Sequence, residues 1–265
     1  MSARPLGDYA GYVFDLDGTL YLGEHLIPGA DRALAALRAA GKRVAFISNK
    51  PLGRAAEYAA KLTRLGLPAD PTEVVNSPVA LRWYLEQAHP GASVFLLGED
   101  PVREELERGG LRLTEDPAAA QVVVVSWDRQ VDYERLNRAL QALRRGAAFV
   151  ATNPDVTCPL PGGEQALDAG SFVALLEAAC GRRVEAIAGK PSPLMLEMIL
   201  RQWQIAPADC LLLGDRLETD LALGRRAGAA VALVLTGVAT REAVAAHAEQ
   251  PDYVLASVAE LGGLS

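Results

Sequence analysis

Two carboxylates stand one residue apart in the segment Asp15-Leu16-Asp17-Gly18-Thr19, directly after the apolar run Tyr12–Phe14. Side chains at positions i and i+2 of an extended strand project to the same side, so we expect both carboxylates to point into one cleft where the strand ends. Two like charges that close repel each other unless a cation binds between them. The spacing therefore predicts a divalent metal site, with one carboxylate as nucleophile and the other as proton carrier.

Two neighbouring residues fit the same interpretation. Gly18 allows a backbone turn that a residue with a Cβ resists, and Thr19 adds a hydroxyl group. On its own, however, the segment is equally consistent with a strand that ends in an ordinary Asp-Gly turn.

Three later segments also carry polar side chains at predicted strand ends or helix starts. They contribute Ser48 and Asn49, then Lys190, then Asp215 and Asp220. Because open α/β sheets bind ligands beyond the carboxyl ends of their strands, we expect these groups to share one site with the paired carboxylates.

Taken in order, these four groups of residues resemble the four motifs of the haloacid dehalogenase (HAD) superfamily, and the chain looks like one of its phosphatases. The resemblance runs from Asp15 to Asp220. A second set of motifs is similar to the class IIA, NagD-like p-nitrophenylphosphatase family: Ala151-Thr152-Asn153-Pro154-Asp155, Pro161-Gly162 and Asp168-Ala169-Gly170-Ser171.

Lys50 is a difference from the family pattern, because many relatives continue the second motif with another Asn. It either adds positive charge near a substrate anion or points to solvent.

The resemblance implies Mg²⁺-dependent hydrolysis of a small phosphomonoester through an aspartyl-phosphate on Asp15. Hard oxygen ligands without a histidine cluster also favour Mg²⁺ over zinc. Asp15, the Asp17 backbone carbonyl and Asp215 are the expected metal ligands. The Asp17 side chain is expected to protonate the leaving oxygen and then to deprotonate the attacking water.

The resemblance also assigns the groups that would bind the substrate. These are Gly18, Thr19, Ser48, Asn49 and Lys190, with Lys190 also counted as catalytic because it faces the transferring phosphoryl group. Asp220 is expected to orient Lys190 or Asp215 from behind, although a carboxylate near a helix start needs no such role.

Asn153 and Asp155 belong to a stiff Asn-Pro-Asp turn. If the turn faces the catalytic residues, both side chains could contact the leaving group of the substrate. Alternatively, they cap their own loop and bind its backbone.

The pattern alternates strands and helices throughout, which predicts a Rossmann-like parallel-sheet core of the α/β class. After Lys190, for example, it predicts a helix over 193–202, a strand over 210–214 and a helix over 218–227. Roughly 140 residues separate the second motif from the lysine, enough for an inserted α/β domain, which in this superfamily is the type-2 cap. We predict a core over 1–78 and 186–265 and a cap over 79–185.

Composition limits the remaining possibilities. The chain has 265 residues and a net charge of −7, which argues against nucleic acid as a partner. No apolar stretch approaches the roughly 20 residues of a membrane helix, and the first eleven residues lack the apolar core of a secretory signal. The three cysteines are widely spaced, as in proteins of reducing compartments. We therefore expect a cytoplasmic protein without a membrane partner, acting on a small phosphorylated metabolite.

Alternative functions stay open. A phosphomutase or phosphotransferase would retain the same motifs, but such relatives usually carry an earlier cap. Dehalogenation would need neither the metal nor Asp17 as an acid. A catalytically silent, ligand-binding relative would be favoured by loss of the nucleophile or the lysine, and both are present. Since cap-to-cap dimers occur among relatives, a homodimer is also consistent with the resemblance.

Overall fold

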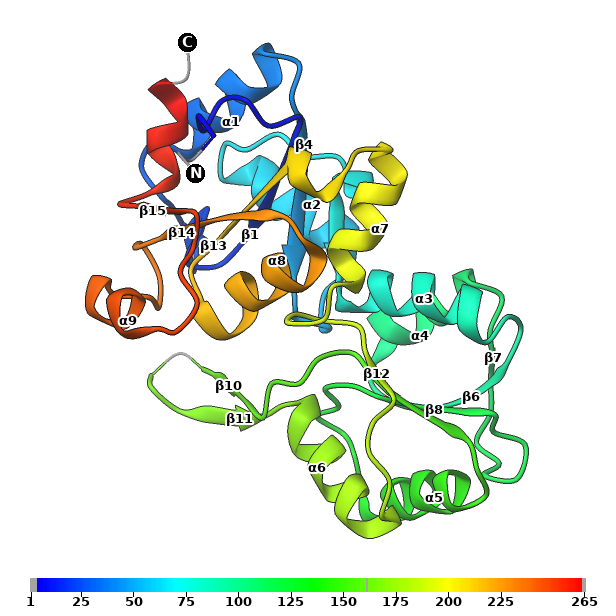
Figure 1. Ribbon diagram of the computed structural model, residues 1–265. Helices are drawn as coiled ribbons and strands as arrows, with labels where there is room; N and C mark the ends of the chain where they lie inside the picture. Colours follow the sequence, from blue (N-terminus) through cyan, green and yellow to red (C-terminus); the bar gives the residue numbers. More distant parts are fainter. Residues whose placement is uncertain (1–3, 161, 264–265) are drawn as a thin grey trace. The chain divides into compact units, whose positions relative to one another are not determined.

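The computed structural model describes residues 4–160 and 162–263, which form two compact units (Figure 1). Unit 1 comprises the described residues up to Ser48, the segment Ala55–Val75 and the residues from Lys190 onward. Unit 2 comprises Asn49–Arg54 and Asn76–Gly189. The functional division into a core and a cap with boundaries at 78 and 185 stays a prediction. Pro161, part of one family motif, lies outside the described residues.

Unit 1 contains a six-stranded sheet in the order β15-β14-β13-β1-β4-β5. The pairings of β1 with β13 and β4, of β13 with β14, and of β14 with β15 are all parallel. The strands are β1 (Gly11–Asp15), β4 (Arg43–Ser48), β5 (Val74–Asn76), β13 (Cys210–Gly214), β14 (Ala230–Val234) and β15 (Tyr253–Leu255). β1 and β13 are buried along their whole length, as expected of central strands covered on both faces.

Unit 2 contains its own parallel sheet of five strands, in the order β12-β9-β8-β6-β7. These strands are β6 (Ser93–Leu97), β7 (Arg112–Leu113), β8 (Val122–Val125), β9 (Ala148–Ala151) and β12 (Ala186–Ile187). Two small antiparallel hairpins complete the strands: β2 (Tyr21–Leu22) with β3 (His25–Leu26) in unit 1, and β10 (Thr157–Pro159) with β11 (Gln165–Leu167) in unit 2. The α/β class with parallel sheets, predicted from the sequence, is confirmed.

Helices connect the strands in both units. Unit 1 has α1 (Ala30–Ala39), α2 (Ala55–Arg64), α7 (Leu194–Trp203), α8 (Ala222–Ala227) and α9 (Arg241–Ala246), with the short turns η1 (Pro71–Glu73), η2 (Pro207–Asp209), η3 (Leu217–Leu221) and η4 (Val258–Gly263). Unit 2 has α3 (Ser77–Ala88), α4 (Asp100–Arg108), α5 (Tyr133–Arg144) and α6 (Ala169–Cys180). None of the helices in the described ranges is long and apolar enough to cross a membrane.

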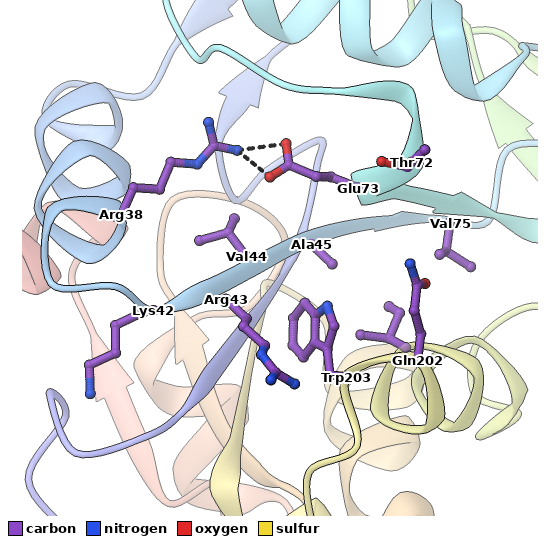
Figure 2. Close-up of a pocket in the computed structure, with 11 residues that line it drawn as sticks. Arg38, Lys42, Arg43, Val44, Ala45, Thr72, Glu73, Val75, Gln202 and Trp203 are labelled. Atoms are coloured by element: carbon purple, nitrogen blue, oxygen red, sulfur yellow. Dashed lines mark hydrogen bonds and ion pairs between the residues drawn. The ribbon is translucent and has the colours of Figure 1, made fainter.

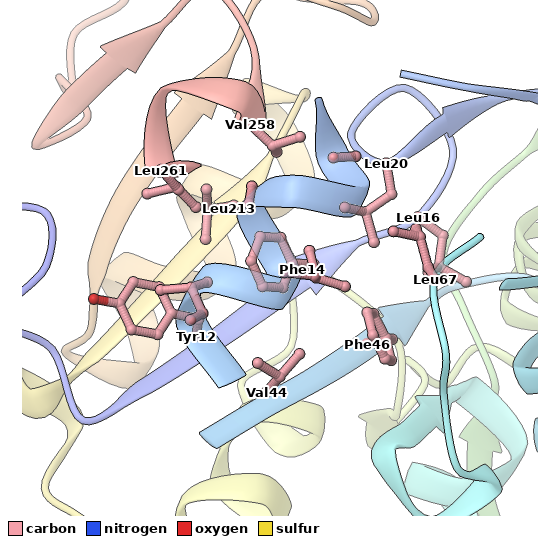
Figure 3. Close-up of a cluster of buried hydrophobic side chains, with 14 of the residues drawn as sticks. Tyr12, Phe14, Leu16, Leu20, Val44, Phe46, Leu67, Leu213, Val258 and Leu261 are labelled. Atoms are coloured by element: carbon pink, nitrogen blue, oxygen red, sulfur yellow. The ribbon is translucent and has the colours of Figure 1, made fainter. Parts of the chain in front are cut away.

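The unit 1 sheet separates two apolar clusters. Tyr12, Phe14 and Phe46 belong to the larger one, together with Val258 and Leu261 of η4 (Figure 3). Residues of α1 and α2 also belong to it. Val231 and Leu233 of β14 belong to the smaller cluster, whereas their strand neighbours Ala232 and Val234 belong to the larger. This alternation buries both faces of the sheet and holds its strand ends in fixed positions.

One connection differs from the expected helix over 218–227. The chain first makes a π-helical turn, η3, and only then the α-helix α8. π-Helical turns are rare in proteins, and those that occur are often found at functional sites. This one carries Asp220, whose position is described below.

Candidate active site

Three polar residues stand at the carboxyl ends of adjacent strands in unit 1. Asp15 is the last residue of β1, Ser48 is the last residue of β4, and Asp215 directly follows β13. Since β1 lies between β4 and β13 and all three run parallel, these ends meet at one edge of the sheet. All three residues are buried.

Lys190 is the centre of a buried ion-pair network at this edge. Its Nζ lies 2.6 Å from Oδ1 of Asp15 and 2.7 Å from Oδ1 of Asp220. The second carboxylate oxygen of Asp220 accepts a hydrogen bond of 3.1 Å from the backbone N–H of Arg216. Both oxygens of Asp220 are therefore engaged, and Asp220 holds the ammonium group against Asp15.

The local backbone explains how Asp220 reaches this position. The π-helical turn η3 begins two residues after Asp215, and the Asp220 side chain folds back against the end of β13. A Cβ at Gly214 would overlap the Asp220 carboxylate, so glycine is needed there for the two segments to approach.

Burial and mutual repulsion shape the pKa values of these groups. Burial raises the pKa of Asp15 to about 7, with Lys190 opposing this shift and the carboxylates of Asp220 and Asp215 adding to it. Burial also raises the pKa of Asp215, against the hydrogen bond from Val238. Burial disfavours the charged form of Lys190, yet Asp15 and Asp220 together raise its pKa above the usual value. The ammonium form of Lys190 is therefore retained, whereas burial disfavours the charged forms of Asp15 and Asp215.

The arrangement fits a divalent cation. One oxygen from each of Asp15, Asp215 and Asp220 lies within 4.8 Å of the others. Oδ1 of Asp215 is buried and has no hydrogen-bond partner among the described residues, a costly state for a carboxylate unless a ligand binds it. Three carboxylates face a single ammonium, so a hard divalent cation would balance the remaining charge. The family resemblance predicts the backbone carbonyl of Asp17, rather than the Asp220 side chain, as the third metal ligand.

The turn after β1 separates its polar side chains. The Asp17 side chain is exposed and accepts a weak hydrogen bond of 3.4 Å from Gly23 N–H, whereas Thr19 is fully buried. The Thr19 hydroxyl has no partner within the described part of the chain. Gly18 has a φ of 90°, which favours glycine, and packs against the Asp215 side chain.

The predicted cap residues form a polar network within unit 2. Asn153 is fully buried, and its Nδ2 donates to Asp155 at 3.1 Å and to Asp168 at 3.0 Å. Its Oδ1 accepts a hydrogen bond of 2.7 Å from the Thr152 hydroxyl. Asn49 also donates to Asp155, at 3.0 Å. The Asn153 amide thus makes hydrogen bonds that hold its own loop in place. Contact with a leaving group stays a prediction.

The segment after β14 was not identified from the sequence, although it contacts two of the predicted site residues. The Thr236 hydroxyl donates to the carbonyl oxygen of Gly18 at 2.6 Å, and Val238 N–H donates to Asp215 Oδ2 at 2.8 Å. A sequence signal existed, because the alternating pattern of strands and helices also predicts a strand over 230–235. Polar residues at its carboxyl end would lie beside those of the neighbouring strands.

A separate cavity of about 240 Å³ lies at the opposite, amino-terminal end of β4 (Figure 2). Arg43 and Trp203 line it, and Arg38 binds Glu73 beside it through two hydrogen bonds. Because parallel α/β sheets bind substrates at their carboxyl ends, this cavity is not the site formed around Asp15.

Two family models match the chain. The haloacid dehalogenase-like hydrolase model matches residues 12–112, and the HAD-hydrolase-like model matches residues 187–261. Rat (Rattus norvegicus) chronophin is 37% identical over 280 residues, which cover 98% of this chain and 90% of chronophin. Sugar-phosphatase AraL of Bacillus subtilis (strain 168) is 34% identical over 256 residues, covering 97% of this chain and 93% of AraL.

Solved structures agree with the sequence relatives. The 4-nitrophenylphosphatase of Thermotoga maritima is similar with a TM-score of 0.92 and 33% identity, covering 99% of this chain and all of that one. A structure named putative nagD protein has a TM-score of 0.89 and 33% identity, covering 97% of this chain and 98% of that one. The predicted family is confirmed: the chain belongs to the haloacid dehalogenase-like hydrolases, among the NagD-like p-nitrophenylphosphatases.

Proposed function

We propose that this phosphoric monoester hydrolase uses Mg²⁺ and an aspartyl-phosphate intermediate to hydrolyse small phosphomonoesters. The observation that carries the proposal is the buried pairing of Asp15 with Lys190 at 2.6 Å, beside two further carboxylates. A carboxylate in this position is poised to act as a nucleophile, and the ammonium is poised to stabilise phosphoryl oxygens.

Asp15 is the proposed nucleophile in the first step. One of its carboxylate oxygens forms a bond to phosphorus while the ester P–O bond breaks, and the leaving oxygen takes a proton from Asp17. The exposed position of the Asp17 side chain supports this role, because a proton carrier must reach both substrate and water.

The second step returns the enzyme to its starting state. Asp17 takes a proton from a water molecule, the water oxygen forms a bond to phosphorus, and the bond between Asp15 and phosphorus breaks. Inorganic phosphate leaves and Asp15 is again a free carboxylate. Ser48, the Asn49 backbone and Lys190 are proposed to bind the phosphoryl oxygens throughout, with Gly18 and Thr19 shaping that end of the site.

Asp15, Asp215 and the Asp17 backbone carbonyl are proposed to hold Mg²⁺. The ion would neutralise charge where an anionic carboxylate meets an anionic phosphate. Asp220 is proposed as the residue that orients Lys190, since both of its oxygens already have partners.

The proposed substrates are small metabolites such as sugar phosphates or nucleoside monophosphates. Two relatives support this size class by name, a sugar phosphatase and a phosphatase of 4-nitrophenyl phosphate. Asn153 and Asp155 of the proposed cap are held rigidly, which suits a fixed loop presented to a small substrate. A cytoplasmic location and a homodimer stay predictions.

Release of inorganic phosphate from p-nitrophenyl phosphate, with Mg²⁺ and with EDTA, tests the proposal. Wild type and the matched surface control Asp31→Asn should show equal, Mg²⁺-dependent release, and Asp15→Asn should show none. Enzyme exposed to ³²P-labelled substrate and quenched in acid should carry label that hydroxylamine removes in wild type and Asp31→Asn, but not in Asp15→Asn. Turnover that survives the Asp15 change would overturn the proposed nucleophile.

A further inference from the structure

The segment Thr236–Ala239, here called the clamp segment, connects β14 to α9 and binds both acid-bearing loops of the proposed metal site. It contacts the turn after β1 through Gly18 and the end of β13 through Asp215. Gly18 and Thr236 are 218 residues apart in the chain. The clamp segment is therefore a tertiary link between two of the proposed metal-binding loops.

Asp215 receives two hydrogen bonds from the clamp segment. Val238 N–H donates to its side-chain Oδ2 at 2.8 Å, and Ala239 N–H donates to its backbone carbonyl at 2.9 Å. The side chain therefore cannot rotate freely, and Oδ1 is the oxygen that stays unpaired and buried. Because the clamp segment binds Oδ2 of Asp215, Oδ1 is the oxygen that remains available to a cation.

Gly18 is held from both sides. Its N–H donates to the carbonyl of Tyr21 at 2.7 Å, and its own carbonyl accepts the Thr236 hydroxyl at 2.6 Å. Because each peptide unit is planar, fixing the Gly18 N–H also fixes the orientation of the Asp17 carbonyl in the same peptide. The Thr236 bond holds the next peptide and so restrains the two soft dihedrals of Gly18, a residue that otherwise has great conformational freedom.

Gly18 and Gly237 both pack closely against Asp215. A Cβ at Gly237 would overlap the Asp215 carboxylate, and a Cβ at Gly18 would meet both that carboxylate and the Gly237 backbone. Gly18, Asp215 and Gly237 are thus in close contact, and the hydroxyl of Thr236, the neighbour of Gly237, binds the Gly18 carbonyl.

We propose that Thr236 is a positioning residue for the metal site: its hydroxyl bond to Gly18 sets the Asp17 carbonyl and the Asp215 carboxylate at the separation that Mg²⁺ requires. This inference rests on the proposed function for the identity of the metal ligands. It adds a residue outside the four motifs, acting without touching the substrate.

The test measures Mg²⁺ binding directly, by isothermal titration calorimetry of the full-length protein without substrate. Thr236→Val keeps the side-chain shape but removes the hydroxyl, and should weaken Mg²⁺ binding about 3- to 10-fold, as expected for the loss of one hydrogen bond. Thr236→Ser restores the hydroxyl and should bind within about twofold of wild type. Turnover by Thr236→Val should recover when Mg²⁺ is saturating.

Thr240→Val is the matched control for general loosening of this loop. The Thr240 hydroxyl accepts a hydrogen bond from Ala243 N–H at 3.2 Å and caps α9, without contact to Gly18. This variant should bind Mg²⁺ like wild type. Equal weakening by Thr240→Val, wild-type affinity of Thr236→Val, or absence of Mg²⁺ binding by the wild type would each overturn the inference. If wild type binds Mg²⁺ with the expected variant pattern but hydrolyses no phosphomonoester, the proposed function fails while the clamp stands.

Discussion

The ammonium group of Lys190 lies 2.6 Å from Oδ1 of Asp15, and both side chains are almost completely buried. The pair joins two segments that are 175 residues apart in the chain. In a free enzyme, this contact keeps the proposed nucleophile next to the cation that would later face the phosphoryl oxygens. Asp220, on the other side of Lys190, prevents the ammonium from turning away.

The first prediction concerns the removal of this ammonium. Lys190→Met leaves Asp15 and Asp220 buried without a counter-charge and should lower the free energy of unfolding by about 3–5 kcal/mol. It should also lower kcat/KM at least about 100-fold, because the phosphoryl oxygens lose their cation. Urea unfolding and steady-state kinetics measure the two effects. The control Lys61→Met removes a partly exposed ion pair with Glu24 and a contact with the Tyr21 ring, and should lower the free energy of unfolding much less. Equal losses in both variants would contradict the prediction.

A second prediction separates the two aspartates that flank Asp15. In Asp215→Asn the oxygen without a partner loses its charge, so the dissociation constant for Mg²⁺ should rise at least about tenfold. Asp220→Asn should change it by less than about threefold, because both Asp220 oxygens are already bound by Lys190 and Arg216. Turnover should fall in both variants. Calorimetric titration with Mg²⁺ measures both dissociation constants. A larger increase in Asp220→Asn than in Asp215→Asn would indicate that Asp220 is a metal ligand.

A third prediction concerns the pH dependence of stability in unit 2. Burial raises the pKa of Asp168 above its ordinary value of 3.8, against hydrogen bonds from Asn153 and Ala169. A carboxyl group whose pKa is higher in the folded chain stabilises the fold fully at pH values below its unfolded pKa. This contribution is lost as the pH rises through the folded pKa.

Asp168→Asn cannot ionise and lacks this pH dependence. The unfolding free energy of wild type minus that of Asp168→Asn should therefore decrease as the pH rises above 3.8. Calorimetric unfolding of both proteins across a series of buffers measures it. A difference that increases with pH would show that the buried carboxylate is stabilised by its partners.

The fourth prediction concerns the edge of the sheet far from the site. A Cβ at Gly11 would overlap the indole ring of Trp203, which lines the cavity of Figure 2. Gly11→Ala should therefore cost about 1–3 kcal/mol and shift the tryptophan fluorescence. Gly262→Ala, where nothing lies closer than 3.8 Å, is the control and should stay within about 0.5 kcal/mol of wild type. Urea unfolding that ranks the two variants equally would contradict the predicted overlap.

The fold class and the approximate position of the candidate site could be predicted from local sequence. Buried apolar runs that end in Asp15, Ser48 and Asp215 indicated parallel strands, and alternating helices indicated the α/β class. Since parallel strands end at a common edge, the approximate meeting of these residues followed from the pattern. The order of the four motifs indicated the family, which the relatives confirm.

Other features depended on contacts between distant segments. The sequence predicted one helix where the chain makes η3 before α8, and this π-turn is what brings Asp220 to Lys190. It left Asn153 between contact with the substrate and a role within its own loop. The structure adds that the buried Asn153 amide makes three side-chain hydrogen bonds in unit 2, and contact with the substrate stays a prediction.

Local sequence thus determined which strands end in acids, because strand periodicity and turn chemistry act over a few neighbouring residues. Only the tertiary structure decided that Thr236 binds Gly18, that Asp215 Oδ1 has no hydrogen-bond partner among the described residues, and that Asp220 forms an ion pair with Lys190. These are choices among hydrogen-bond partners, and burial removes water as an alternative partner only once the chain has folded.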